Sequence, residues 1–380
     1  MSTATPADNI PAPPPGCPFN AEFLPPNLRK HVDPAAPVPL RMMAAKSLVP
    51  LNPSDMVGAL FMLTFDPDAG VRETAAKTCV GLPDRILGSA LRDEGVQPQV
   101  LGFFLGQLKD KEAYAEMLIL NPETPDDAVA GVAGNCSAKL AEIISQNQLR
   151  LLRHEDILRN LCGNPNATAS LIDGVCDFAV RSGLMLVDVP QMKAARVRLF
   201  GPEAAEAPPP DAGPTAEQIL QEFQDVAQEE AAPMDEGKRL TLSQRILKMS
   251  ISEKIKLATL GNKEARTALI RDTNKLVSVA AIRSPRITDG EVLSAAANRA
   301  MTDDVLRVIY NNREWTKNQK VKLALLKNPK VPLTVTMKFL NMVRETELKD
   351  LSRDKNVPSA VQAFAKKLLE KKTAPKKDGH

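Results

Sequence analysis

Aromatic residues are scarce in this chain of 380 residues: they make up 4% of it, with one Trp and two Tyr. Histidine is also rare, at three residues. The sequence therefore offers little for base stacking or for acid–base catalysis by imidazole. Hydrophobic residues still account for 43% of the chain, so the core has to be built from aliphatic side chains. Such a core favours closely packed helices over sheets.

Cysteine is limited to five residues, with no CxxC pair and no histidine at metal-ligand spacing from any of them. This spacing argues against a zinc site and against a thioredoxin-like motif. We predict reduced, buried thiols, with a metal or redox site as the alternative. The five residues are Cys17, Cys79, Cys136, Cys162 and Cys176.

Motifs that cradle phosphates or supply activated nucleophiles are absent. The sequence contains no GxGxxG, GxxxxGKS/T, HExxH or GxSxG. His154 and Cys162 lie eight residues apart across a predicted helix, which gives no reason to expect a catalytic dyad. We therefore predict no catalytic residues, no metal and no cofactor, and a protein that is not an enzyme.

Long hydrophobic runs are missing as well. The longest, Met56–Phe65 and Val100–Leu105, fall far short of the ~20 residues that a bilayer span needs. The first residues lack a basic region followed by an apolar stretch, so no signal peptide is expected. These patterns predict a soluble, cytoplasmic protein.

An internal repeat organises the chain. The segment Pro122–Pro165 aligns with Pro285–Pro329, which contains one extra residue. A period of about 44 residues is typical of helical repeat arrays. The aligned pairs are Pro122 with Pro285, Asp126 with Asp289, Val129 with Val292, Ala133 with Ala296, Asn135 with Asn298, Asn147 with Asn311, Leu161 with Leu325, Asn164 with Asn328 and Pro165 with Pro329.

Short helices separated by Asn, Pro, Ser and Asp turn signals account for most of the chain. Each is too short to be stable alone in water, so lateral packing has to hold it. A weak strand candidate covers 184–189. The predicted helices are 56–65, 68–80, 84–92, 97–107, 110–119, 125–133, 137–146, 153–162, 167–181, 241–249, 252–260, 263–270, 274–283, 288–298, 302–311, 316–327, 332–343, 345–353 and 358–371.

A family resemblance is carried by two short motifs. The residues Asp68, Val71, Arg72 and Ala75 resemble the Asp-x-x-Val-Arg-x-x-Ala pattern of HEAT repeats, and Asn121–Pro125 looks like the turn of the leucine-rich-repeat variant. The corresponding stretch 274–280 lacks the arginine, and the second half is similar to uncharacterised bacterial helical-repeat proteins. The resemblance implies an all-α fold, an α-α superhelix of HEAT/armadillo type, and lends no activity. Some DNA glycosylases and chromophore lyases also use such scaffolds, so an enzyme remains an alternative.

The recurring asparagines have two interpretations. Asparagine tolerates the left-handed conformation at helix ends and caps helices, which predicts turn residues. The alternative is a ligand-binding asparagine ladder, which the resemblance to armadillo domains implies. The residues concerned are Asn135, Asn147, Asn164, Asn298, Asn311 and Asn328.

Composition divides the chain into a proline-rich start, two helical modules, an acidic linker and a basic tail. Residues 1–200 carry 18 basic and 22 acidic side chains, residues 201–237 carry ten acids and no base, and residues 238–380 carry 31 bases and 14 acids. The predicted boundaries are a disordered leader at 1–37, helical-repeat modules at 38–200 and 238–371, an acidic linker at 201–237 and a tail at 372–380.

The acidic linker contains one amphipathic helix. Thr215 and Gln218 form a capping-box signature. Nothing nearby in the sequence covers the apolar face, so we expect the helix to fold back on the basic module and mask it until a partner displaces it. The apolar face consists of Ile219, Leu220, Phe223 and Val226.

A basic stripe on the predicted helix 316–327 is the candidate partner surface. It predicts a non-catalytic scaffold or adaptor that binds other proteins through acidic segments. Two alternatives stay open: a merely solvated face, and a nucleic-acid-associated protein whose phosphate contacts would be salt-dependent. The stripe consists of Lys317, Lys320 and Lys327, with Arg313 and Trp315 at its start.

Overall fold

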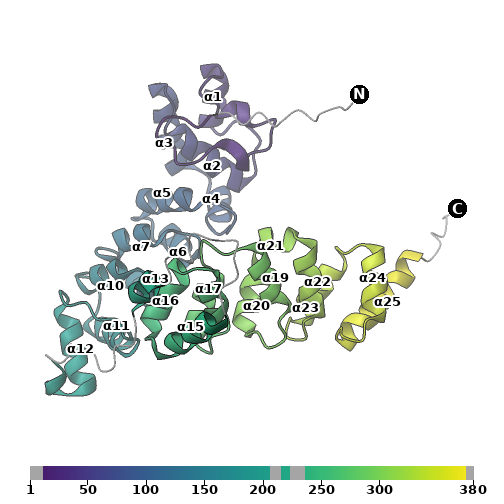
Figure 1. The fold of residues 1–380 in the computed structure, drawn as a ribbon. Coiled ribbons are helices and arrows are strands. Elements are labelled where there is room, and N and C mark those ends of the chain that lie inside the picture. Colours follow the sequence, from purple (N-terminus) through teal and green to yellow (C-terminus); the bar gives the residue numbers. More distant parts are fainter. Residues whose placement is uncertain (1–11, 206–214, 223–235, 374–380) are drawn as a thin grey trace. The chain divides into compact units, whose positions relative to one another are not determined.

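The computed structural model describes residues 12–205, 215–222 and 236–373, and these residues form helices and turns without a strand (Figure 1). The all-α prediction is confirmed, and the segment 184–189 forms a turn rather than a strand. The chain divides into two compact units, which are described separately below. The first comprises the residues up to Phe178 together with Leu186–Ala195, and the second comprises Ala179–Met185 and the residues from Arg196 onward.

The proline-rich start differs from expectation. Residues 12–37, expected to belong to a disordered leader, contain the short 3-10 helices η1 (Ala21–Phe23) and η2 (Arg29–His31). Ala21 and Leu24 are buried, and the ring of Phe19 stacks on Phe61 with centroids 5.5 Å apart. Proline fixes φ without preventing burial, so scattered apolar residues are sufficient for packing here. Residues 1–11 lie outside the described part of the chain.

Two rows of short helices make up the first unit. The helices α2, α4, α6 and α8 contact one another in succession, and so do α3, α5, α7 and α10. Contacts between α2 and α3, α5 and α6, and α7 and α8 join the rows. The helices are α1 (Val38–Ala45), α2 (Pro53–Leu63), α3 (Ala69–Gly81), α4 (Asp84–Leu91), α5 (Pro98–Leu108), α6 (Glu112–Leu120), α7 (Asp126–Ala133), α8 (Ala138–Gln146), α9 (Gln148–Arg153) and α10 (Glu155–Cys162).

Two helices, α11 (Ala169–Arg181) and α12 (Pro190–Phe200), contribute residues to both units. The remaining elements belong to the second unit, in which α16, α18 and α20 contact in succession, as do α20, α21, α22 and α23. They are η3 (Pro202–Ala205), α13 (Ala216–Glu222), α15 (Glu236–Lys248), α16 (Ile251–Leu260), α17 (Lys263–Leu269), α18 (Lys275–Ile282), α19 (Asp289–Ala297), α20 (Asp303–Asn311), α21 (Arg313–Lys317), α22 (Gln319–Lys327), α23 (Leu333–Leu340), α24 (Glu345–Arg353) and α25 (Ser359–Thr373).

Each copy of the internal sequence repeat contains four helices. The first copy consists of α7, α8, α9 and α10, and the second of α19, α20, α21 and α22. The first and last helices of each copy contact each other, α7 with α10 and α19 with α22. The extra residue of the second copy lies in the turn between α19 and α20, where lengthening a loop costs little.

Buried asparagines hold the repeats together. Asn164 Nδ2 donates to the carbonyl of Ala133, the last residue of α7, at 2.8 Å, and to that of Cys136 at 3.1 Å. Asn328 Nδ2 donates to the carbonyls of Ala296 and Asn298 at 3.0 and 3.1 Å. Asparagine thus satisfies the carbonyls that a helix leaves open at its end.

A third residue outside the aligned repeat makes the same contact. Asn121 Nδ2 donates to the carbonyl of Leu91, at the end of α4, at 2.9 Å and to that of Asp93 at 3.3 Å. In all three cases Oδ1 accepts the backbone N–H two residues later and a proline follows, which fixes an Asx turn. Asn147 caps α9 and Asn298 accepts the Ala300 N–H. The prediction of turn residues is confirmed for Asn135, Asn147, Asn164, Asn298 and Asn328. It is wrong for Asn311, which is the last residue of α20.

Two acids, Asp66 (buried) and Asp272 (half-buried), anchor the turns that precede α3 and α18. Asp66 pairs with Arg41 and accepts the Asp68 N–H at 2.8 Å. Asp272 pairs with Lys254 at 2.9 Å and accepts the Asn274 N–H at 2.8 Å. The residues of the HEAT-like motif therefore have structural roles: Asp68 caps α3, while Val71 and Ala75 are completely buried.

Replacing Asn164 by Ala should destabilise the first unit by about 2 kcal/mol, because the carbonyl of Ala133 at the end of α7 would lose its amide donor while remaining buried. Asn135 lies in the same repeat but is exposed, so Asn135→Ala should change stability by less than about 0.5 kcal/mol. Urea denaturation followed by far-ultraviolet circular dichroism measures both. Equal effects of the two substitutions would contradict the role assigned to Asn164.

Acid should weaken the second unit through Glu291, which is buried and bonded to Arg266 through two contacts of 3.0 Å. Burial opposes the charge of Glu291, but hydrogen bonds from Arg266 and Thr288 outweigh it and lower the pKa of this carboxyl below 4.5. The folded form therefore gains stability above the unfolded pKa and loses it as the pH falls through the lowered folded value.

The matched variant is Glu291→Gln. At neutral pH it should cost about 3 kcal/mol, because it leaves the buried Arg266 charge without its partner. Its denaturation free energy should also fall less steeply than that of the wild type as the pH drops below about 4.5. Parallel pH profiles for the two proteins would show that Glu291 does not carry this dependence.

Candidate protein-interaction surfaces

The basic stripe expected on one helix is divided between two. Asn318 accepts the Lys320 N–H at 3.0 Å and caps α22, so the predicted helix 316–327 breaks there. Lys317 belongs to α21 with Arg313 and Trp315, whereas Lys320 and Lys327 belong to α22. Asparagine competes for backbone hydrogen bonds in this way and favours helix starts over helix interiors.

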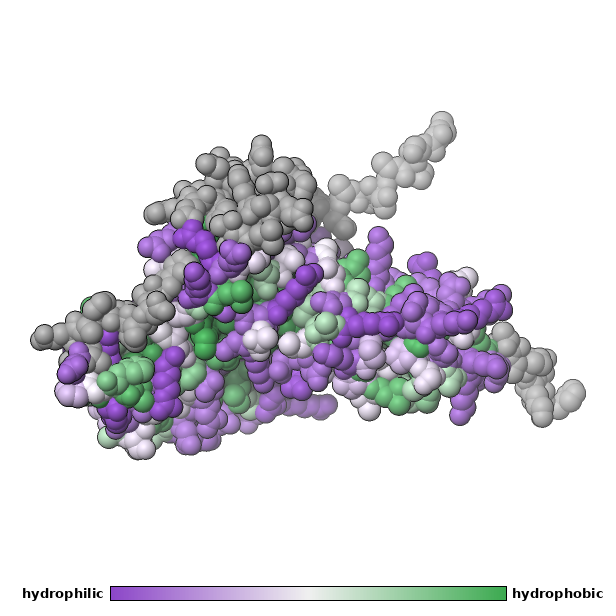
Figure 2. Space-filling model, turned by 60° about the horizontal axis from the view of Figure 1, so that its bottom comes forward, coloured by the Kyte–Doolittle hydropathy of each residue, from purple (hydrophilic) through white to green (hydrophobic). Residues whose placement is uncertain are grey.

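Acidic neighbours neutralise part of the stripe. Lys317 Nζ lies 2.6 Å from Glu314, and Lys327 Nζ lies 2.9 Å from Asp354. The pKa of Asp354 is lowered by the backbone N–H of Asn356 and by Lys327. Lys320 is exposed, and no carboxylate of the described residues pairs with it. Hydrophilic residues cover much of this part of the molecule in the view of Figure 2.

The linker helix α13 lies on α16. The expected capping box is present: Thr215 N–H donates to Gln218 Oε1 at 3.0 Å, and Gln218 N–H donates to Thr215 Oγ1 at 3.2 Å. Ile219 is 2% exposed, and Leu220 is half-buried. Of the four residues expected on the apolar face, Phe223 and Val226 lie outside the described residues.

A carboxylate of α16 fixes the start of α13. Glu253 Oε2 accepts the backbone N–H of Ala216, the first residue of α13, at 2.8 Å. Ala216 is completely buried. A negative charge at a helix N-terminus complements the helix dipole, so this contact aligns α13 as well as binding it.

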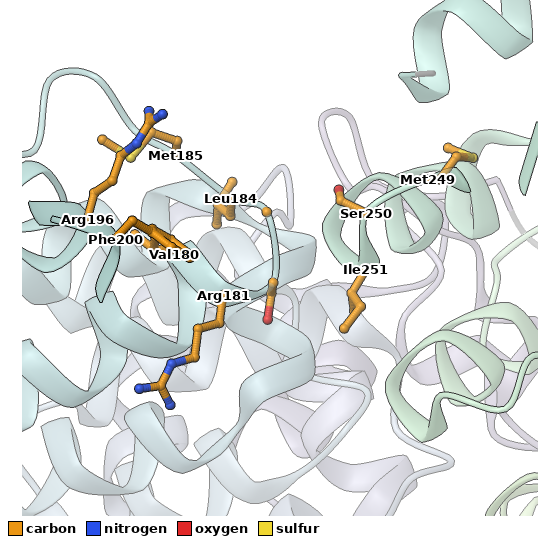
Figure 3. Close-up of a pocket in the computed structure, with 11 residues that line it drawn as sticks. Val180, Arg181, Leu184, Met185, Arg196, Phe200, Met249, Ser250 and Ile251 are labelled. Carbon is orange, nitrogen blue, oxygen red and sulfur yellow. The ribbon is translucent and has the colours of Figure 1, made fainter. Parts of the chain in front are cut away.

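A cavity of about 320 Å³ lies within the second unit, at the turn that follows α11 (Figure 3). Figure 3 shows Val180, Arg181, Leu184, Met185, Arg196 and Phe200 on one side and Met249, Ser250 and Ile251 on the other. Apolar side chains form much of the wall, and Arg196 is buried whereas Arg181 is exposed. Neither arginine was predicted from the sequence, because the residues meet only through the turn at Gly183.

A second depression lies between α4 and α6 in the first unit, with a volume of about 710 Å³. Arg85 of α4 and Arg92, which directly follows α4, line it on one side, and Tyr114 and Met117 line it from α6. The Tyr114 hydroxyl donates to Asp84, and this hydrogen bond raises the pKa of the phenol. The depression therefore combines side chains of both charges with exposed apolar atoms.

Metal ligands do not gather anywhere in the described part of the chain: no group of three or more His, Cys, Asp or Glu side chains is placed to hold an ion. Cys79, Cys136, Cys162 and Cys176 are buried thiols, and Cys17 is half-buried. Within the same residues, no helix combines the length and the apolar character required to cross a membrane.

Comparison with known proteins adds no family assignment. No protein-family model, no curated protein and no solved structure matches the chain. The HEAT/armadillo resemblance thus rests on the sequence motifs of this chain alone.

Replacing Gly183 by Ala should destabilise the second unit by about 3 kcal/mol. Gly183 has φ +85°, and an added Cβ would lie 2.5 Å from the Cβ of Ser250, so both strain and a steric clash oppose the substitution. Gly201 has φ +89° with no atom within 4 Å of an added Cβ. Gly201→Ala should therefore cost only about 1 kcal/mol. Thermal denaturation of the two variants compares them, and equal losses would mean that the close approach to Ser250 contributes nothing.

Proposed function

We propose that this protein is a non-catalytic helical-repeat scaffold or adaptor, an α-α superhelix of HEAT/armadillo type that binds other proteins. The observation that carries the proposal is the contact of α13 with α16: the second unit already holds a short amphipathic helix by an apolar contact and a helix-end contact. A surface that binds one amphipathic helix can bind amphipathic helices of other proteins in the same way.

The succession of helix contacts in each unit supports the fold. In the first unit, α2, α4, α6 and α8 contact one another in succession, and so do α3, α5, α7 and α10. The helices α7 to α10 and α19 to α22 follow one another in the same order, and the first and last helices of each set are in contact. Stacked units of this kind present extended faces, which repeat proteins use to contact partners.

The strength of the α13 contact suits an internal ligand that a partner displaces. Burying an isoleucine such as Ile219 contributes about 1.5–3 kcal/mol, and the hydrogen bond from Ala216 N–H to the Glu253 carboxylate contributes about 1.5–3 kcal/mol more. The two together suffice only for weak binding of a separate helix. Attachment to the same chain raises the effective concentration of α13 into the millimolar range, so it occupies α16 without excluding a better-binding competitor.

The charges of the linker and of the basic module, together with the apolar contact of Ile219, support one kind of partner. The linker from 201 to 237 carries ten acids and no base, and residues 238–380 carry 31 bases and 14 acids. The competing partner is therefore an acidic segment that forms an amphipathic helix, with an apolar residue in the place of Ile219. Lys320 on α22 is an exposed base of the same basic segment.

Deleting residues 214–231 should open the α16 surface. A synthetic peptide of residues 214–231 should then bind the deletion variant with a dissociation constant of roughly 0.1 mM and should not bind the full chain, whose site is occupied. Isothermal titration calorimetry measures both. A peptide with Ile219→Asp should not bind, whereas Glu217→Gln, at an exposed position, should leave binding nearly unchanged.

The partner experiment uses the deletion variant and the full chain as affinity baits in lysate of the source cell, with and without nuclease. More protein captured by the deletion variant, unaffected by nuclease, supports masking by α13. Identical captures by the two baits contradict it. A captured set that disappears with nuclease favours the alternative function, phosphate-backbone binding by the basic module, and this binding should weaken by orders of magnitude between low and moderate salt.

A further inference from the structure

Two of the buried cysteines lie against each other. Cys162 is the last residue of α10 and Cys176 lies in α11, and their sulfurs are 3.6 Å apart. Both belong to the first unit. The sequence separates them by 14 residues with no CxxC spacing, so only the packing of α10 on α11 reveals the pair.

We propose that Cys162 and Cys176 are an oxidative modification site, a dithiol that a peroxide converts to an intramolecular disulfide. A disulfide holds its sulfurs about 2.0 Å apart, so the two sulfurs have to move closer together for the bond to form. The other cysteines are not part of this contact, which confines the reaction to one pair.

The reaction has a defined order. Cys162 retains 7% exposure while Cys176 has none, so a small peroxide reaches Cys162 first. The Cys162 sulfur attacks the peroxide: an S–O bond forms, the O–O bond breaks, and water leaves, which gives a sulfenic acid. Cys176 then attacks that sulfur, an S–S bond forms, the S–O bond breaks, and the hydroxide takes the Cys176 proton as water. Two electrons pass from the sulfurs to the peroxide.

The environment of Cys162 favours this chemistry over the same reaction elsewhere in the chain. The hydrogen bond from Cys176 lowers the pKa of Cys162, against the opposing effect of burial. By contrast, burial raises the pKa of Cys79 to about 12 and raises that of Cys136. Since the thiolate is the reactive form, Cys79 and Cys136 should remain reduced when Cys162 is oxidised.

The disulfide would fix a helix that both units share. Cys176 lies one helical turn before Ala179–Arg181, which belong to the second unit. Two of these residues, Val180 and Arg181, line the 320 Å³ cavity. The backbone carbonyl of Cys162 also accepts Gln191 Nε2 of α12 at 3.3 Å. Oxidation therefore adds a covalent bond to a contact where α10, α11 and α12 already meet.

The test uses the folded full chain treated with dilute hydrogen peroxide, then unfolded, alkylated and digested with trypsin. The peptide of residues 160–181 contains both Cys162 and Cys176 and no internal Lys or Arg, whereas residues 78–85 and 112–139 carry only Cys79 and Cys136. We expect peptide 160–181 to lose two hydrogen atoms and escape alkylation, with recovery after dithiothreitol. The two control peptides should be alkylated throughout.

Serine variants test whether the disulfide requires both Cys162 and Cys176. Cys162→Ser and Cys176→Ser should each abolish the lighter peptide, while Cys79→Ser should retain it. Hydrogen exchange of α11 and of residues 182–185 should slow on oxidation of the wild type but not of either serine variant. Alkylation of peptide 160–181 at the same rate as the controls, or crosslinks that instead join Cys79 or Cys136, would overturn the proposal.

Discussion

The packing of this protein depends on helix ends that are closed by asparagine from a distant turn. Each of α4, α7 and α19 ends in carbonyls that no residue of its own helix can satisfy. Asn121, Asn164 and Asn328, placed 28 to 32 residues later, supply the missing donors and are buried. One side chain thereby sets the distance between neighbouring helices and shapes the turn that follows, so helix spacing and chain direction are fixed together.

The two copies of the repeat keep this closure and diverge elsewhere. In the first copy Arg150 is 3% exposed and donates to the carbonyls of Asn121 and Thr124 and to Asp126, each at 2.7 Å. The register that pairs Asn147 with Asn311 places Glu314 at the position of Arg150. Glu314 is exposed and pairs with Lys317. At this position the first copy thus has a buried charge that makes internal hydrogen bonds, whereas the second copy has an exposed charge.

Sequence patterns predicted the structural features that are determined by residues close together in the chain. Helical periodicity is local, and the predicted helices 68–80 and 288–298 correspond to α3 and α19. The six-residue α9 was missed because its length is near the lower limit of a helical pattern, and α1 because it starts among prolines. Asn318 was read as helix interior although it caps α22, since the sequence alone does not show which competing hydrogen bond it makes.

The candidate sites were less predictable, because they depend on residues that meet only after folding. The capping box of α13 was evident from Thr215 and Gln218, whereas the acceptor Glu253 for its first N–H was not. Nothing in the spacing of Cys162 and Cys176, or of Gly183 and Ser250, indicates that they touch.

The sharing of α11 between the two units bears on how this chain could be divided. A cut in the acidic linker, where composition changes most, would separate Ala179–Met185 from the second unit to which these residues belong. The N–H of Ser252 in α16 would lose its acceptor, the carbonyl of Ser182, and Gly183 would no longer close over Ser250. The boundary marked by charge and proline therefore does not coincide with the division between the two compact units. A duplication, fusion or domain exchange that preserved both units would have to carry the end of α11 with the second.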